Sequence, residues 1–99
     1  MPMPQAKFQL GQCCSTPGAL SALEATGEAP IVYLARHSSG DWGDLSGDDK
    51  ARNDAALIPN EDGECERILS AYHLKDGTKI WVITEWDRSV TTILLPSEC

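Results

Sequence analysis

The sequence predicts a single α+β domain, in which an N-terminal strand and two to three short helices pack on a C-terminal three-stranded antiparallel meander. Before residue 59, apolar residues recur at helical spacing between prolines and glycines, whereas after residue 66 the period becomes strand-like. The 99 residues, 41% of them hydrophobic, suffice for one small core. We therefore expect one domain over residues 1–99, with residues 1–6 disordered.

The first strand and helix are expected before residue 28. Residues Lys7–Cys14 alternate weakly between apolar and polar and are predicted as a strand. Thr16 before Pro17 indicates a helix start, because threonine caps a first turn and proline lacks an N–H that such a turn would leave unpaired. Gly27 can adopt the left-handed conformation that ends a helix. A helix of about ten residues is expected between them.

A second helix is expected to begin at Pro30 and to end at Gly40. Arg36 and His37 would lie in its last turn, where the helix dipole favours positive charge. The predicted buried stripe, at the spacing i, i+3, i+4, consists of Ile31, Leu34 and Ala35.

A third, short helix is expected from Asp48 to Leu57. Ser46 would cap it, and Asp49 completes a pattern that resembles a capping box. Its apolar stripe is thin and consists of Ala51, Ala55 and Ile58. The composition of residues 59–64 is that of a loop.

Three strands follow, over Arg67–Leu74, Lys79–Glu85 and Val90–Leu95, because these runs are rich in β-branched and aromatic residues. Asp76-Gly77 is typical of a two-residue type I′ hairpin turn, which needs positive φ at both residues. An even-numbered turn is expected at residues 86–89.

These turns predict which side chains share a face of the meander. Tyr72 lies opposite Trp81 in the first hairpin, and Thr84 lies opposite Thr91 in the second. The face expected against the helices carries Leu69, Ala71, His73, Ile80, Val82, Thr84, Thr91, Ile93 and Leu95. The opposite face carries Ile68, Ser70, Tyr72, Trp81, Ile83, Thr92 and Leu94. Its apolar group around Tyr72 and Trp81 is either a partner-binding patch or part of the core.

The formal net charge of −7 arises entirely between residues 41 and 66. Only Lys50 and Arg52 oppose the nine acids in this segment, which are Asp41, Asp44, Asp48, Asp49, Asp54, Glu61, Asp62, Glu64 and Glu66. The segment is either a solvated surface or a face that docks on a basic protein partner. Direct binding to nucleic acid is disfavoured, because the chain has no cluster of bases to neutralise phosphates.

Several function classes are excluded by missing patterns. No apolar run is long enough to span a membrane and the start does not resemble a signal peptide, so we expect a cytoplasmic protein without a membrane partner. Cys13, Cys14, Cys65 and Cys99 have neither zinc-finger nor thioredoxin spacing and are interpreted as reduced structural thiols. Without chelating or nucleotide-binding motifs, we expect no metal and no cofactor.

The motif Arg36–Leu45 combines several chemistries in a glycine-punctuated loop, where functional side chains often lie. The candidate binding residues are Arg36, His37, Asp41, Trp42 and Asp44 in this motif and Tyr72 and Trp81 in the meander. Each also has a structural interpretation: His37 can stabilise the helix end and Trp42 can anchor the loop to the core. Asp41 and Asp44 can accept backbone hydrogen bonds in turns.

The segments RHSSGDWGDL, from Arg36 to Leu45, and ILSAYHLKDGTKIWVITEWDRSVTTILLP, from Ile68 to Pro96, resemble a family of small plasmid-related proteins. Some members are labelled as a type I restriction endonuclease subunit, although 99 residues leave no room for the cofactor domain of a methyltransferase subunit. The resemblance implies an accessory protein of a mobile genetic element. Together with the acidic segment, it suggests a noncatalytic protein that docks on a basic, nucleic-acid-handling partner, as anti-restriction and anti-CRISPR proteins can.

The order of helices before an antiparallel sheet also resembles compact ribonucleases of the barnase, EndoU, colicin and RelE-like group. This resemblance implies an alternative, a metal-independent ribonuclease or toxin in which His37 or His73 transfers protons. Arg36 or Lys75 would stabilise the phosphate, and the hydroxyl of Thr84, Thr91 or Thr92 would position it. The acids beside His37 oppose this reading, since they repel RNA.

Overall fold

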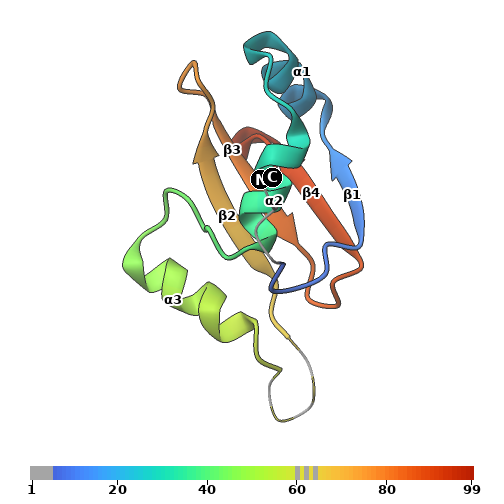
Figure 1. The fold of residues 1–99 in the computed structure, drawn as a ribbon, viewed down its shortest axis with the longest axis vertical. Helices are drawn as coiled ribbons and strands as arrows, with labels where there is room; N and C mark the ends of the chain where they lie inside the picture. Colours follow the sequence, from blue (N-terminus) through green and yellow to red (C-terminus); the bar gives the residue numbers. More distant parts are fainter. Residues whose placement is uncertain (1–5, 60, 62, 64) are drawn as a thin grey trace.

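A computed structural model describes residues 6–59, 61, 63 and 65–99 of the chain, so the disorder expected of residues 1–6 lies, apart from Ala6, outside the described residues. The predicted α+β class is confirmed (Figure 1). In chain order the elements are β1 (Gln12–Ser15), α1 (Pro17–Thr26), α2 (Pro30–Ser38), α3 (Gly47–Ala56), β2 (Ile68–His73), β3 (Lys79–Thr84), β4 (Val90–Leu94) and the 3₁₀ turn η1 (Pro96–Glu98).

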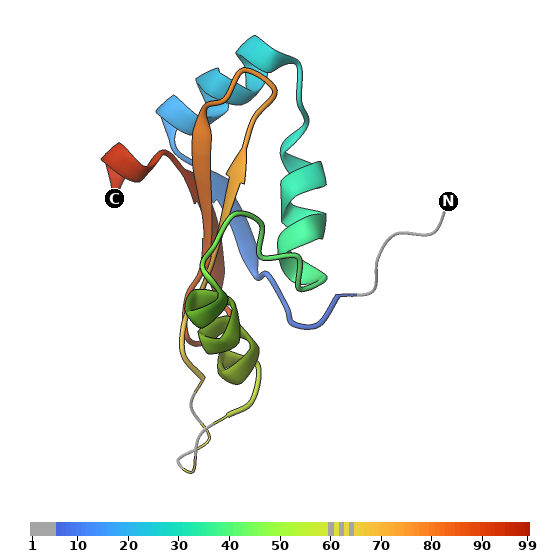
Figure 2. The same cartoon turned by 90° about the vertical axis from the view of Figure 1, so that its left-hand side faces the viewer.

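The sheet has the strand order β1-β4-β3-β2. The three C-terminal strands form the expected antiparallel meander, and β1 adds to it in parallel beside β4. The first strand is shorter than predicted and begins later, because Gly11 has a φ of 65° and interrupts the extended backbone. Helix α2 lies on one side of the sheet and η1 on the other (Figure 2). We call the side of α2 the inner face and the opposite side the outer face.

The helix ends follow the capping signals in the sequence. The Thr16 hydroxyl accepts a hydrogen bond from the Ala19 N–H at 3.3 Å, and Gly27 ends α1 with a φ of 69°. The Ser46 hydroxyl accepts from the Asp49 N–H at 3.1 Å at the start of α3. These local signals fix where each helix begins more reliably than which side it buries.

The predicted buried stripe of α2 is wrong in part. Leu34 is buried, but Ile31 is 58% exposed and Ala35 is only half-buried. Tyr33 and His37 face the sheet instead. The helix is turned so that the ring of Tyr33 packs against Tyr72, with 5.3 Å between ring centroids, and His37 reaches polar groups of the sheet.

The predicted stripe of α3 is also wrong, because Ala51, Ala55 and Ile58 are exposed. The helix buries Asn53 and Ala56 instead. Asn53 is buried because its amide serves the backbone of β2, a polar role that a search for apolar spacing does not detect.

The first hairpin differs from the prediction by one residue. His73 pairs with Lys79 and Tyr72 with Ile80, so the loop is longer than Asp76-Gly77 and Tyr72 does not lie opposite Trp81. Gly77 has a φ of 89°, but Asp76 is not among the described residues with positive φ, as a type I′ turn would require. The Asp76 carboxylate accepts from the Thr78 N–H at 2.9 Å and holds this alternative turn. The second hairpin has the predicted register, with Thr84 opposite Thr91.

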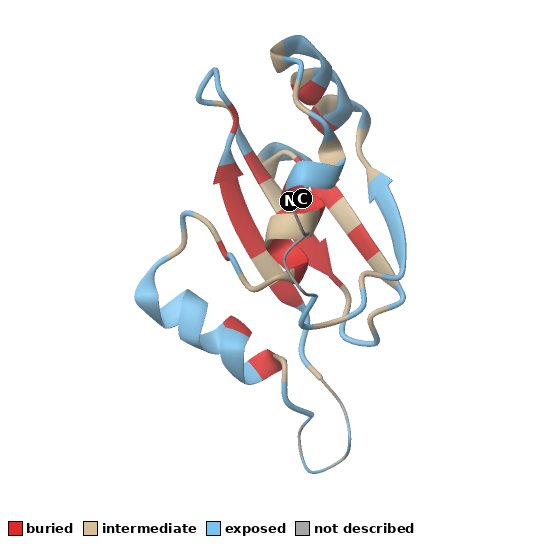
Figure 3. Cartoon of the chain, viewed as in Figure 1, coloured by how far each residue is buried: buried red, intermediate tan, exposed pale blue. Residues whose placement is uncertain are grey.

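A shift of one residue turns every side chain of a strand to the other face. Ile68, Ser70 and Tyr72 therefore lie on the inner face, in place of the predicted Leu69, Ala71 and His73. The main core cluster of the described residues contains Ala19, Leu23, Tyr33, Leu34, Tyr72, Leu74, Ile80, Val82 and Ile93 (Figure 3). A second cluster contains Trp42, Ala56 and Ile68.

The outer face carries apolar side chains as expected, although Tyr72 is not among them. Ile83 and Leu94 are 6% and 7% exposed, and Trp81, which pairs with Leu94, is half-buried. Neither core cluster of the described residues includes these three side chains.

The free edge of the sheet at β2, on the side away from β3, is covered by two segments of the chain. The Asn53 amide donates to the Leu69 carbonyl at 2.6 Å and accepts from the Leu69 N–H at 3.3 Å. Ala71 is the next residue whose backbone groups point away from β3. Its carbonyl accepts from the Asp44 N–H at 2.7 Å, and its N–H donates to the Trp42 carbonyl at 3.2 Å. Gly43 lies between these two bonds as an isolated parallel bridge to Ala71.

Replacement of Gly43 by alanine is expected to destabilise the fold far more than replacement of Gly27. Both glycines have φ near 70°, but an added Cβ at Gly43 would lie 2.0 Å from the Ala71 oxygen, whereas nothing lies within 4 Å at Gly27. Gly27→Ala isolates the backbone strain of about 1–2 kcal/mol. Gly43→Ala adds the clash, and we expect a total loss of about 3 kcal/mol or more in urea unfolding. Equal losses in the two variants would contradict this assignment.

Candidate functional site

The imidazole of His37 lies between the inner face of the sheet and α2, where it joins two strands. Its Nδ1 is 2.5 Å from the Ser70 hydroxyl of β2, and its Nε2 is 2.9 Å from the Thr84 hydroxyl of β3. Thr84 in turn contacts Thr91 of β4 at 2.7 Å, and Thr91 donates to the Leu10 carbonyl at 2.7 Å. All four side chains are completely buried.

The Leu10 carbonyl, at the end of this series of hydrogen bonds, fixes the direction of every bond in it. Because a carbonyl can only accept, the Thr91 hydroxyl donates its one proton to Leu10 and must accept from Thr84. Thr84 has then used its own proton and must accept from the Nε2–H of His37. Nδ1 is left bare and accepts from Ser70. His37 is therefore the neutral Nε2–H tautomer.

Burial lowers the pKa of His37 from 6.5 to about 3, with the nearby charge of Arg88 as a smaller cause. The ring also lies edge-on to Phe8 and Trp42, at 5.2 and 6.0 Å between centroids. A substrate phosphate has no access to a histidine and a threonine that are both 0% exposed. This geometry argues against the ribonuclease alternative at His37 and Thr84, and for a structural role of both residues.

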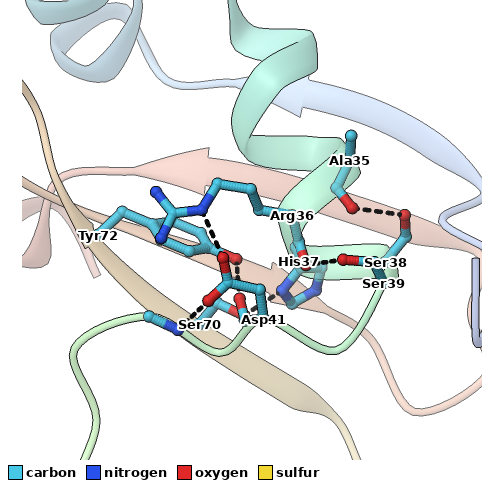
Figure 4. Close-up of polar contacts among 9 residues, drawn as sticks. Ala35, Arg36, His37, Ser38, Ser39, Asp41, Ser70 and Tyr72 are labelled. Atoms are coloured by element: carbon cyan, nitrogen blue, oxygen red, sulfur yellow. Dashed lines mark hydrogen bonds and ion pairs between the residues drawn. The ribbon is translucent and has the colours of Figure 1, made fainter. Parts of the chain in front are cut away.

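Four residues of the motif, Arg36, Asp41, Gly43 and Asp44, line an open groove of about 400 Å³ beside the edge of β2. The Arg36 Nε donates to the Asp41 carboxylate at 2.7 Å, and its guanidinium lies over the Tyr72 ring, 4.4 Å from the centroid (Figure 4). The Tyr72 hydroxyl donates to the Asp41 carbonyl at 2.6 Å. Arg36 thereby holds the pKa of Asp41 below its usual value. Asp41 also accepts from the Gly43 N–H at 3.2 Å, the turn role expected from the sequence.

His73 and Asp44 lie at the far side of the same groove. The His73 Nδ1 is 3.4 Å from an Asp44 carboxylate oxygen, and both side chains are exposed. His73 extends from the outer face of β2, whereas His37 is buried against the inner face. The two histidines of the ribonuclease alternative are thus on opposite sides of the sheet.

Trp42 anchors α3 to the sheet. It is 4% exposed, packs with Ala56 and Ile68, and its indole N–H donates to the Asp54 carboxylate at 2.9 Å. This agrees with the anchoring role expected from the sequence. The Asn53 amide also bonds to the backbone of β2, so α3 is held against the sheet by both the Trp42 indole and the Asn53 side chain.

Helix α3 and the loop after it expose acids to the solvent. Asp48, Asp49 and Asp54 are exposed, and Glu61 and Glu66 of the following loop are exposed as well. Asp62 and Glu64 lie outside the described residues. Among the described acids of the segment, only Asp41 and Asp44 form ion pairs with a base. A shallow hollow of about 180 Å³ beside the helix is lined by Asp49, Arg52 and Arg67, together with Leu45, Asn53 and Leu69.

The remaining candidates do not join this site. Trp81 and Thr92 lie on the outer face of the sheet, in β3 and β4. Lys75 lies in the first hairpin loop, where its backbone N–H donates to Glu28 at 3.1 Å.

Sequence reasoning missed Arg88, a base that serves carbonyl groups of three segments. Its guanidinium donates to the Ala56 and Glu66 carbonyls at 2.7 Å and to the Glu85 carbonyl at 3.3 Å. It also lies over the Phe8 ring, 5.7 Å from the centroid. Among the described residues other than glycine, Arg88 alone has a positive φ, of 60°. This uncommon backbone conformation is the local sign that its position is specified by other contacts.

Comparisons with protein-family models, curated proteins and solved structures gave no match to this chain. In the described part of the chain, no helix is long and apolar enough to cross a membrane. No group of three or more histidine, cysteine or acidic side chains among the described residues is arranged to hold a metal ion.

The stability of the protein is expected to fall as the pH decreases from about 6.5 toward 4.5. His37 takes up a proton readily in the unfolded chain but not in the fold, where its pKa is about 3. Its contribution is complete above pH 6.5 and is lost below it, with a slope approaching about 1.4 kcal/mol per pH unit. The slope in urea unfolding should largely vanish in His37→Gln. The lowered carboxylate pKa values, such as that of Glu28, act only below about pH 4.5.

The tautomer can be tested by nuclear magnetic resonance. The ring nitrogens of His37 are expected to show a protonated Nε2 and a bare Nδ1, with no titration between pH 8 and 5. Thr91→Val removes the donor to Leu10 and should weaken this preference, because Thr84 can then donate to the ring. A titrating His37, or a protonated Nδ1 in the wild type, would contradict the derived direction of the hydrogen bonds.

Proposed function

We propose that this chain is a noncatalytic accessory protein of a mobile genetic element, active in the cytoplasm, that docks through its acidic segment on a basic, nucleic-acid-handling protein. The observation that carries the proposal is the arrangement of the described residues of the acidic segment, which are residues 41–59, 61, 63, 65 and 66. The segment that holds the whole net charge is built on a helix whose acids face the solvent. That helix is fixed to the sheet by Trp42 and Asn53.

A rigid mounting favours binding, because a preorganised charged surface loses little conformational entropy when it docks. The acids Asp48, Asp49, Glu61 and Glu66 have no base paired with them among the described residues, so their field is available to a partner. Fields of this kind steer a basic partner and set specificity more than raw affinity.

The groove lined by Arg36, Asp41, Asp44 and His73 lies at the edge of β2, and its two acids are the first two of the acidic segment. Its two carboxylates outnumber its one permanent base, so it too favours a basic side chain over a phosphate. The burial of His37 and Thr84 supports a binding role over the ribonuclease alternative.

The proposal predicts a salt-sensitive protein partner. The tagged chain should retain a protein partner from nuclease-treated host lysate at about 0.1 M salt and release it at about 1 M salt. Over this range the electrostatic screening length falls from about 10 Å to about 3 Å. Asp48→Asn/Asp49→Asn should weaken retention about 2- to 30-fold, the range for two exposed ion pairs.

The matched control is Glu24→Gln/Glu85→Gln, which removes two acids outside the segment and should retain the partner as the wild type does. Thermal unfolding checks that each variant is folded, since Asp48 and Asp49 also favour the first turn of α3. No partner, or one retained equally at both salt concentrations, would count against acidic docking. Growth arrest on overexpression that His73→Ala relieves would instead support the nuclease alternative.

A further inference from the structure

The two edges of the sheet are treated differently by the fold. The edge of β2 is closed by Asn53 and by the backbone of residues 42–44. The edge of β1 lies at the opposite end of the strand order, and no backbone partner is found for it among the described residues except β4 (Figure 1). Exposed edges are templates for another strand unless charge, proline or a covering segment protects them.

The hydrogen bonds to β4 show which groups of β1 point outward. The Gln12 N–H donates to the Ser89 carbonyl and the Thr16 N–H to the Ile93 carbonyl, both at 2.9 Å. Backbone groups alternate in direction along a strand. The N–H and C=O of Cys13 and Ser15 are therefore directed away from β4, into the open edge.

This edge is electrically neutral in a chain of net charge −7. Residues 8–23, which include all of β1, contain no charged side chain. The nearest acid with a recorded contact is Glu98, which is already engaged by the Thr16 hydroxyl and the Gly18 N–H at the end of the strand. The acidic segment lies beside β2, at the other edge of the sheet (Figure 1).

We propose that two copies of this chain pair through β1, antiparallel across a two-fold axis that passes beside Cys14. In this register Cys13 and Ser15 of one copy lie opposite Ser15 and Cys13 of the other, and each pair exchanges both of its backbone hydrogen bonds. A second copy fits this edge because it offers the same neutral strand. The pairing also keeps the two acidic segments at the far ends of an extended sheet.

The alternative register, with Cys13 on the axis, fits less well. It would require Gly11 to pair as an extended residue, and its φ of 65° is not extended. With Cys14 on the axis, the paired segment is residues 12–16, whose midpoint is Cys14 and which ends where Pro17 starts α1.

The two Cys14 residues would form a non-hydrogen-bonded pair, in which the Cα atoms are about 4.5 Å apart. This separation lies within the range of disulfides, about 4.4–6.8 Å. Their side chains share a face, since Cys14 pairs with Thr92 on the outer side of the sheet. The thiols are exposed, so an added oxidant can reach them.

Sedimentation equilibrium in reducing buffer tests the pairing without any disulfide. We expect the mass to rise from 10.7 kDa toward twice that value as the concentration increases to about 0.5 mM, a range that includes weak association through small interfaces. Cys13→Pro removes an outward donor that the fold does not use, and should be monomeric. The matched control Cys13→Ser keeps the backbone donor and should dimerise.

A second variant guards against misfolding of the proline variant. Cys14→Lys places two like charges opposite each other on the axis and should be monomeric while its thermal unfolding stays close to that of the wild type. A monomeric wild type over the whole range would overturn the proposal. So would a dimer that survives both variants, or one lost only in Trp81→Ser, which would place the contact on the outer face.

Crosslinking tests the register. Diamide, which accepts two electrons and two protons as two thiols join, should give a covalent dimer in a variant that retains only Cys14. A variant that retains only Cys13 should crosslink at least tenfold more slowly. Faster crosslinking through Cys13, or through Cys99 alone, would overturn the register.

Discussion

The hydrogen-bonded chain from Ser70 through His37 to Thr84, Thr91 and the Leu10 carbonyl is the interaction on which the rest of the structure depends. It contains a member from each strand of the meander, from α2 and from the segment that leads into β1. Buried polar groups are stabilising only when each is satisfied. Every donor and acceptor in this series of hydrogen bonds has a partner, and all the bonds run in one direction. The series is therefore compatible with a single tautomer of His37 and a single register of β2.

That register decides how the edge of β2 is closed. With Ser70 and Tyr72 turned inward, the outward backbone groups of Leu69 and Ala71 meet Asn53 and the residues around Gly43. The same contacts seat α3, so the fold uses its acidic segment to close an edge as well as to present charge.

Much of the fold could be predicted from the sequence because its signals are local. Thr16, Ser46 and Gly27 specify helix ends through groups within four residues, and the register of the second hairpin follows from the even-numbered turn expected at residues 86–89. The first hairpin could not be predicted, since Asp76-Gly77 fits two turns and the choice depends on Ser70 and Tyr72 meeting α2. The same holds for α3, where the decisive contact joins Asn53 to a strand sixteen residues away.

The candidate site was predicted as a motif but not as an arrangement. Arg36–Leu45 contains side chains that look equivalent in sequence, yet consecutive residues have opposite environments: His37 is fully buried, while Arg36 and Asp41 pair at the surface. A histidine near a serine and threonines has the composition of a catalytic site and also of a structural network. Burial distinguishes them, because a proton donor that water and substrate cannot reach serves only its neighbours. Its charge state is then fixed by the fold, and the chemistry that remains available belongs to the exposed carboxylates.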